Sequence, residues 1–464
     1  MNSTTTDTGT PQPSTSPSWW RRNPRWAAFA VVAVVLVLIG AAVIVSQDSE
    51  FDDTVSGPVA EAQTSDDLPD EPIVTDIDDD CGVSAETVEQ LVPDGDRHNM
   101  ERDEDEHRRC TWNTGGFSWS PGGSNRELEV EVEASGVTET PEPAIADGIT
   151  NYTRTLDWEA REDVDTELGQ VTAFTGLGDE AVVYDQLVAS DEVESDDEEM
   201  DEDGVQYRTA HTTVLFRVGN VVVSVGYAGA DYRPEEDADL LDDPEEELLD
   251  PDSTRGGAMY VAEEIVESMG VEVADSLEAA PTETDPPVLT ELPDMCAELD
   301  DTALQDVGDD SPDTEDSFLF EGYTSIHDAD MDAQRCQWRD EGRLEIDVGV
   351  VADERLGGAL PTAEREYLLQ RYRASATPEP EAYKPDDEPA PDHVFVPLSG
   401  LGEAAYASYT DDGSRPEAEL TFHKRGLLIR VQHHQSLGDS LEADAALNAV
   451  YSTAVEVADV VEDL

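Results

Sequence analysis

The feature that most constrains the fold is an internal duplication marked by the four cysteines. Cys81 and Cys110 lie in the first half of the chain, and Cys296 and Cys336 lie in the second. In each half the second cysteine is followed two residues later by a tryptophan, as CTW and as CQW. We therefore expect two related modules, with disulfides that pair Cys81 with Cys110 and Cys296 with Cys336.

The two halves repeat a longer order of structural signals. A short helix is expected after each first cysteine, with Ser84 and Asp300 placed as N-caps. An alternating strand, LEVEVE or LEIDVGV, follows each second cysteine, and a helix is then expected around residues 145–152 and 363–372. A glycine-rich turn, a β-hairpin and an amphipathic helix close each half. This order predicts an α+β fold with two tandem modules, each a mostly antiparallel sheet packed with helices.

Tight turns are predicted where glycine or asparagine interrupts the strand patterns, because these residues accept positive φ. The predicted turns are GLGDEA from Gly176, GLGEAA from Gly400, and the hairpin turns at Gly219–Asn220 and Arg425–Gly426. An anion-binding role for the GLG turns is the alternative. Asp179 and Glu403 directly follow the glycines and would repel a phosphate, so a turn into the next strand is favoured.

An uncharged apolar stretch over residues 26–47 predicts one N-terminal transmembrane helix, because it approaches the roughly 20 residues needed to cross a bilayer. Three arginines lie within residues 21–25, and the next basic residue is Arg97, so the N-terminus is expected in the cytoplasm. A cleaved signal peptide is the alternative, with small residues at 40–42. The apolar run is longer than the usual h-region of about 7 to 15 residues, which favours an anchor.

Composition divides the chain into six segments. They are a disordered cytoplasmic tail (1–25), the transmembrane helix (26–47), an acidic disordered stalk (48–79), a first module (80–272), a Pro- and acid-rich linker (273–293) and a second module (294–464). We expect the linker to separate two independent domains. Further acidic runs at 190–204 and 234–250 are expected to be surface insertions.

The charge balance excludes one class of partner. The chain has 26 basic and 110 acidic residues, for a net charge of −84. Such a surface repels nucleic acid, so no nucleic-acid partner is expected. Acidic residues spread through both halves are typical of a surface adapted to a salty medium, where counterions screen self-repulsion.

The repeated motifs resemble a known family. A cysteine before a short helix, a C-x-W strand start, an LxVxV strand, a GLG-acid turn, a hairpin and a terminal helix resemble actinobacterial secreted domains of unknown function, found in mycobacterial and streptomycete lipoproteins. The resemblance covers roughly residues 80–272 and 294–464 and implies a fold similar to PsbP-like and LpqN-like proteins. It implies no catalytic residues, and this chain differs from the lipoproteins in its predicted transmembrane helix.

Metal-ligand patterns are present but incomplete, so no metal or cofactor is predicted. Asp328, Asp330 and Asp332 match the start of a calcium loop. Ala333 stands where that loop needs glycine, and Arg339 stands where it needs a bidentate glutamate.

Histidines offer no better metal site. His98 and His107 flank an acidic run. His433 adjoins His434, and neighbouring residues on a strand face opposite sides.

No catalytic motif is found, and the predicted function is binding. The chain has no GxSxG elbow, HExxH helix or phosphate loop. Trp112 and Trp338 could line a ligand cleft, although a tryptophan beside a disulfide is more often in the core. We expect a non-enzymatic, membrane-anchored extracytoplasmic protein that binds an unknown envelope or extracellular protein or a small ligand. The alternative is an extracytoplasmic hydrolase whose site is assembled across the fold.

Overall fold

The computed structural model describes a defined part of the chain. The described residues are 56–64, 71–75, 77, 79–103, 107–114, 124–136, 140–159, 166–168, 171–189, 207–233, 245–274, 277–279, 287–298, 313–316, 319, 331–339, 342–352, 358–376, 392–411, 416–435 and 442–464. The predicted tail and transmembrane helix lie outside them. Among the described residues, no helix has the length and hydropathy needed to cross a bilayer.

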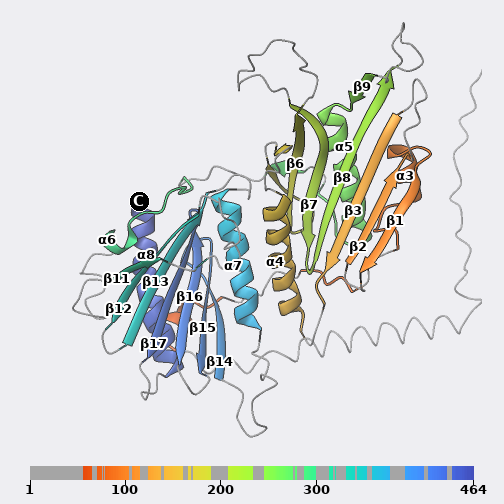
Figure 1. Ribbon diagram of the computed structural model, residues 1–464. Helices are drawn as coiled ribbons and strands as arrows, with labels where there is room; N and C mark the ends of the chain where they lie inside the picture. Colours follow the sequence, from red (N-terminus) through yellow and green to blue (C-terminus); the bar gives the residue numbers. More distant parts are fainter. Residues whose placement is uncertain are drawn as a thin grey trace, which may run out of the picture. The chain divides into compact units, whose positions relative to one another are not determined.

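Each repeat forms one antiparallel sheet (Figure 1). The first contains β1 (Asp96–Asp103), β2 (His107–Asn113), β3 (Ser124–Ala134), β4 (Thr166–Leu168), β5 (Thr172–Thr175), β6 (Glu180–Ala189), β7 (Tyr207–Val218), β8 (Val221–Arg233), β9 (Glu245–Leu248) and β10 (Glu278–Ala279). The second contains β11 (Asp313–Asp316), β12 (Met331–Arg339), β13 (Gly342–Val351), β14 (Asp392–Leu398), β15 (Ala404–Asp411), β16 (Glu417–Lys424) and β17 (Leu427–Gln435).

The two sheets share one strand order. The first follows β1-β2-β3-β8-β7-β6-β5, and the second follows β11-β12-β13-β17-β16-β15-β14. In the first sheet, β10 pairs with β5, β4 with β6 and β9 with β8 as additional strands. The prediction of two α+β modules with antiparallel sheets is confirmed.

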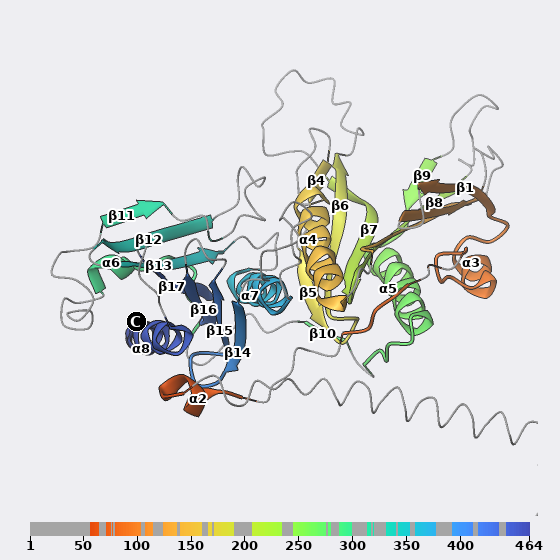
Figure 2. The ribbon, with the colours of Figure 1, turned by 90° about the horizontal axis from the view of Figure 1, so that it is seen from below.

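A long helix lies against each face of each sheet. In the first repeat, α5 (Pro251–Ser268) and α4 (Pro141–Glu159) lie on opposite faces (Figure 2). In the second repeat, α8 (Ala443–Asp463) and α7 (Ala359–Ser375) pack on the corresponding strands. Alternation along the strands gives each sheet two different faces. Leu128, Val130 and Val132 of β3 join the core under α5, and the intervening glutamates lie on the face towards α4.

Both hairpin turns lie where the sequence predicts them. Gly219–Asn220 joins β7 to β8, and Arg425–Gly426 joins β16 to β17. The φ angle is 55° at Gly219, 55° at Arg425 and 81° at Gly426, which is the left-handed region that such turns require.

The short helix predicted after the first cysteine of the first repeat is confirmed, and the one predicted in the second repeat lies outside the described residues. α3 (Ala85–Leu91) begins after Ser84, whose Oγ accepts a hydrogen bond from the Thr87 amide at 3.2 Å. The predicted cap Asp300 lies outside the described residues. The helix described in the second repeat is α6 (Met295–Glu298), where the Ala297 amide donates to Asp294 Oδ1 at 3.2 Å.

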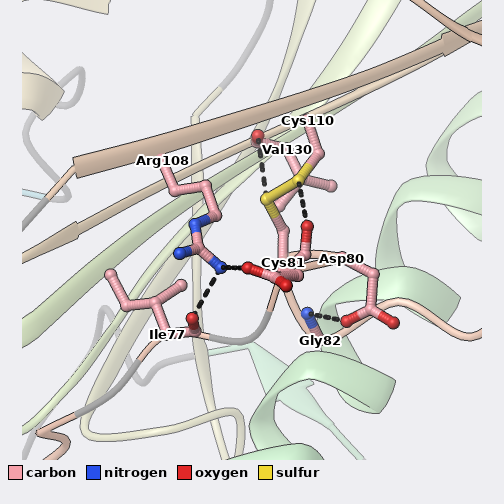
Figure 3. Close-up of a disulfide and its surroundings, with 8 residues drawn as sticks. Ile77, Asp80, Cys81, Gly82, Arg108, Cys110 and Val130 are labelled. Atoms are coloured by element: carbon pink, nitrogen blue, oxygen red, sulfur yellow. Dashed lines mark hydrogen bonds and ion pairs between the residues drawn. A yellow bond between two sulfur atoms is a disulfide. The ribbon is translucent and has the colours of Figure 1, made fainter. Parts of the chain in front are cut away.

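Both predicted disulfides are present. Cys81 pairs with Cys110, and Cys296 with Cys336, with Cα separations of 6.3 and 5.4 Å. Beside the first disulfide, Arg108 Nη1 donates to the Ile77 carbonyl at 2.6 Å and pairs with Asp79 at 3.2 Å (Figure 3). In the second repeat, Gln334 donates to Asp294 at 3.3 Å. Each disulfide is therefore accompanied by a polar contact that ties the start of the module to its second strand.

The two repeats share apolar clusters, which differs from the expectation of independent domains. α4 packs against α7. Tyr152 of α4 lies in one cluster with Tyr367 of α7 and Tyr406 of β15, and Ile149 lies in another with Tyr372. Each of these two helices packs one apolar side against its own sheet and a second apolar side against the other helix. Periodicity alone does not reveal what the second side contacts.

Part of the predicted stalk is ordered. α2 (Pro58–Ala62) buries Val59, whose amide donates to Asn448 Oδ1 of α8 at 3.0 Å. The Thr64 amide donates to the Pro397 carbonyl at 3.1 Å. The expectation of continuous disorder over 48–79 therefore does not hold for this segment, because a few apolar residues among the acids find partners on the second repeat.

An equivalent entry segment precedes each module. Asn220 binds the Val74 backbone through its amide oxygen at 2.9 Å and its amide nitrogen at 3.0 Å. In the second repeat, the Leu289 amide donates to the Arg425 carbonyl at 2.8 Å, and Arg425 Nε donates to the Pro287 carbonyl at 3.0 Å. Both hairpin turns thus hold the segment that leads into their own module, so the end of the predicted linker belongs to the second fold.

The predicted insertion at 234–250 also contributes structure at its end. β9 pairs with β8, and Asp250 caps α5 by accepting from the Ser253 amide at 2.9 Å. Its other residues, 234–244, and the whole run 190–204 lie outside the described residues.

Candidate functional site: the polar faces of the two sheets

The sheet faces that meet α4 and α7 carry charged side chains, and we call them the polar faces. The arginine before the second cysteine pairs with a glutamate in both. Arg109 pairs with Glu129 of β3. Arg335 pairs with Glu345 of β13 at 3.3 Å. The repeats therefore share one ion pair as well as a fold.

On the second polar face the charges are paired within the sheet. Asp347 is fully buried and lies 2.8 Å from Arg335 Nε and 3.0 Å from Arg430 Nη2. The hydrogen bond to Asp347 is the main cause that raises the pKa of Arg335. Gln432 donates to Glu419 at 2.8 Å. These contacts satisfy buried charges and stabilise the sheet rather than leaving groups available for a ligand.

Glu366 of α7 is a buried acid whose carboxyl group has a strongly shifted pKa. Burial raises the pKa of its carboxyl group to about 7. Gln370 Nε2 donates to Glu366 Oε1 at 3.1 Å and lies 3.2 Å from the Leu319 carbonyl. The Glu366 side chain is therefore buried, and its carboxyl group bonds a glutamine of its own helix.

A second buried set of charges links the repeats, and we call it the Arg217 cluster. Arg217 of β7 lies 2.6 Å from Glu71 and 3.1 Å from Glu180. Glu180 also accepts from Arg365 Nε of α7 at 2.5 Å, and the Arg365 guanidinium lies 5.0 Å from the ring centroid of Tyr152. The cluster therefore joins the entry segment, the first sheet and the helix of the second repeat.

Electrostatics favour the charged forms of Glu180 and Arg217, whereas burial raises the pKa of Glu71. Burial opposes the charge on Glu180, but Arg365 and Arg217 outweigh it, and the pKa of Glu180 is lowered. Burial also opposes the charge on Arg217, yet its acidic neighbours raise its pKa. Charged groups with shifted pKa values can mark an active site. Here the charged groups pair with one another, which favours a structural role.

An open groove lies on the first polar face, and we call it the Trp158 groove. It has a volume of about 260 Å³ and is lined by Glu131, Glu133, Arg154, Thr155, Trp158, Val222 and Ser224. Its floor is two cross-strand pairs, Glu131 with Ser224 and Glu133 with Val222. The last turns of α4 form its wall. Trp158 is 69% exposed, the largest value among the described large hydrophobic side chains that are exposed.

The GLG turns act as the sequence predicts. They run into β6 and β15, and the φ angle is positive at both glycines of each turn. Asp179 Oδ2 accepts from the Gly219 amide at 2.5 Å. Glu403 Oε1 accepts from the Arg425 amide at 3.1 Å. The two acids therefore hold the hairpin turns.

The candidate metal ligands are not brought together. Asp328 and Asp330 lie outside the described residues, whereas Asp332 lies in a shallow depression with Asp294 and Thr314. Within the described part of the chain, no three histidine, cysteine or acidic residues are placed to hold a metal ion.

Two of the candidate histidines, His107 and His434, each lie beside a glutamate of their own sheet. His107 bonds Glu131 at 2.7 Å, and His434 lies 3.6 Å from Glu417. His433 alternates to the other face of β17. The side chain of His98, in β1, is outside the described atoms.

The two tryptophans beside the disulfides are core residues. Trp112 and Trp338 are each 5% exposed. The interpretation as core, rather than as the lining of a ligand cleft, is confirmed.

The Arg217 cluster and the Trp158 groove were not predicted from the sequence. One signal for the first is an arginine within the apolar strand TVLFRV. Another is the nine-residue spacing from Pro72 to Cys81 and from Pro287 to Cys296, which marks equivalent entry segments. No local pattern marks Trp158, because its exposure depends on where α4 leaves the sheet.

Comparisons with known proteins give no family assignment. No family model matches the chain, and no curated protein matches it. One similar solved structure is the di-domain ARO/CYC StfQ from the steffimycin biosynthetic pathway, with 9% identity, 71% of this chain and 96% of that chain covered, and a TM-score of 0.14. Another is the dehydratase domain from the CurJ module of curacin polyketide synthase, with 11% identity, coverage of 73% and 96%, and a TM-score of 0.13. Scores this low carry no functional argument.

Proposed function

We propose that the chain is a membrane-anchored extracytoplasmic protein that binds an envelope or extracellular partner and does not act by catalysis. The observation that supports this most directly is the Trp158 groove, because tryptophan side chains with one exposed face are enriched at protein interfaces. The two disulfides support an oxidising compartment. The apolar stretch 26–47 and the arginines before it support the anchor.

An extracytoplasmic hydrolase is the alternative, and Glu366 is the observation that favours it. A carboxyl group with a pKa near neutrality suits proton transfer. However, the Glu366 side chain is only 3% exposed, and Gln370 is bonded to it. A substrate would need α7 to move before reaching this group, so binding is better supported.

Two measurements test the proposal. Protease added to intact protoplasts that express the full chain should digest both modules, and complete protection would contradict the extracytoplasmic location. Purified full-length protein should show no turnover of ester, peptide or glycoside substrates. Turnover that Glu366→Gln abolishes would instead establish the hydrolase.

A further inference from the structure

The Trp158 groove has the size and shape for a single side chain. Its volume of about 260 Å³ is below the roughly 300 to 1,000 Å³ of small-molecule pockets. One wall is the indole of Trp158, and the floor holds Glu131 and Glu133 beside the apolar Val222. Glu131 already bonds His107 at 2.7 Å, so Glu133 is the carboxylate that an incoming cation would pair with. The two glutamates are two residues apart on β3, which places them on one face about 7 Å apart.

The lining selects a cation. The two carboxylates outnumber the one guanidinium among the lining side chains, and an indole face attracts a positive charge. The acidic surface of the whole chain also favours a basic partner, because it draws positive groups towards the protein and repels anions.

Arg154 shows that a guanidinium fits this place. Its Nη2 lies 3.1 Å from Glu133 Oε1, and Arg154 and Trp158 are four residues apart on one side of α4. The Arg154 side chain is 63% exposed, so solvent screens its pair with Glu133, and the pair can be exchanged at little cost. A guanidinium is planar and weakly hydrated, and it stacks on aromatic rings more readily than an ammonium does.

We propose that the Trp158 groove receives an arginine side chain of a partner protein, which stacks on Trp158 and pairs with Glu133 in place of Arg154. This proposal rests on the proposed binding function and names its site and the chemistry of its partner.

The test is an NMR titration of the full-length protein in detergent micelles with the blocked tripeptide Gly-Arg-Gly. The chain has seven tryptophans, and the indole signal of Trp158 is the one that Trp158→Phe removes. That signal should shift on addition of Gly-Arg-Gly, several-fold less with Gly-Lys-Gly, and not with Gly-Gln-Gly. Trp158→Ala should weaken peptide binding about tenfold, the range that a cation–π contact supplies.

Two further variants separate binding from structure. Tyr260 of α5 is also an exposed aromatic residue, at 44%, and Tyr260→Ala should leave peptide binding unchanged. Arg154→Gln should tighten binding several-fold, because it removes the internal competitor, whereas a purely structural role for Arg154 predicts no gain. Equal affinity of wild type and Trp158→Ala, or equal response to Gly-Arg-Gly and Gly-Gln-Gly, would overturn the proposal.

Failure of the groove proposal would leave the proposed binding function in place. A partner protein whose affinity for the full chain is unaffected by Trp158→Ala would show that binding uses another surface, which overturns the groove proposal alone. Turnover that Glu366→Gln abolishes would overturn the proposed function, whatever the tripeptides do.

Discussion

At the scale of single residues, Glu366 should make stability depend on pH. Its pKa is raised by burial from 4.5 to about 7, so the fold favours the neutral carboxyl. Its contribution is fully present below pH about 4.5 and is lost as pH rises through about 7, a change of about 3 kcal/mol. Glu366→Gln should therefore have little effect at pH 4 and should raise the free energy of unfolding at pH 8. Urea denaturation at both pH values checks this, with the exposed Glu86→Gln of α3 as control. An equal effect of Glu366→Gln at both values would contradict it.

Arg365 of α7 should contribute strongly to stability, because it forms an ion pair between the two repeats. Its side chain is 3% exposed and pairs with Glu180, whose side chain is 16% exposed. Arg365→Gln should lower the free energy of unfolding by about 1.5 to 3 kcal/mol, because Glu180 loses one of its two cations and keeps the other, Arg217. The double variant with Glu180→Gln should lose less than the sum of the two single variants. Additive losses in urea denaturation would show that the pair does not interact.

At the scale of elements, the docking of α2 on α8 should depend on the Asn448 side chain. Removing the amide by Asn448→Ala leaves the Val59 amide without its acceptor, at a cost of about 1 to 3 kcal/mol. We expect faster hydrogen exchange in residues 57–64 and little change in β16 and β17. The exposed Ser452→Ala on the same helix is the control. Unchanged exchange in 57–64 would show that α2 does not need this contact.

Elements also show how far sequence reasoning reaches. The strands of β3 and β13, the hairpin turn at Gly219–Asn220 and the disulfides were predictable, because alternation, backbone preference and cysteine placement are local signals. The packing of α4 on α7 was not, since an apolar side of a helix does not specify its partner. The Trp158 groove was missed for the same reason, because it is defined by three elements that meet only in the fold.

At the scale of the whole molecule, salt should stabilise the fold. A net charge of −84 makes self-repulsion large, and the Debye length falls from about 10 Å at 0.1 M to about 3 Å at 1 M salt. The melting temperature should therefore rise with NaCl and rise equally with KCl. A flat trend would mean that the acids are already neutralised locally, and a response to only one cation would indicate a specific site.

The packing of α4 on α7 has a consequence for how such a chain arises. Two helices from equivalent positions of two similar folds meet each other, which is the arrangement of a homodimer whose subunits have become joined in one polypeptide. Fusion frees each half to diverge, because a substitution no longer appears on both sides of the contact. The pairs Glu180–Arg217 and Ala404–His423 show this, since they occupy the same cross-strand position in the two sheets but only the first is charged on both strands.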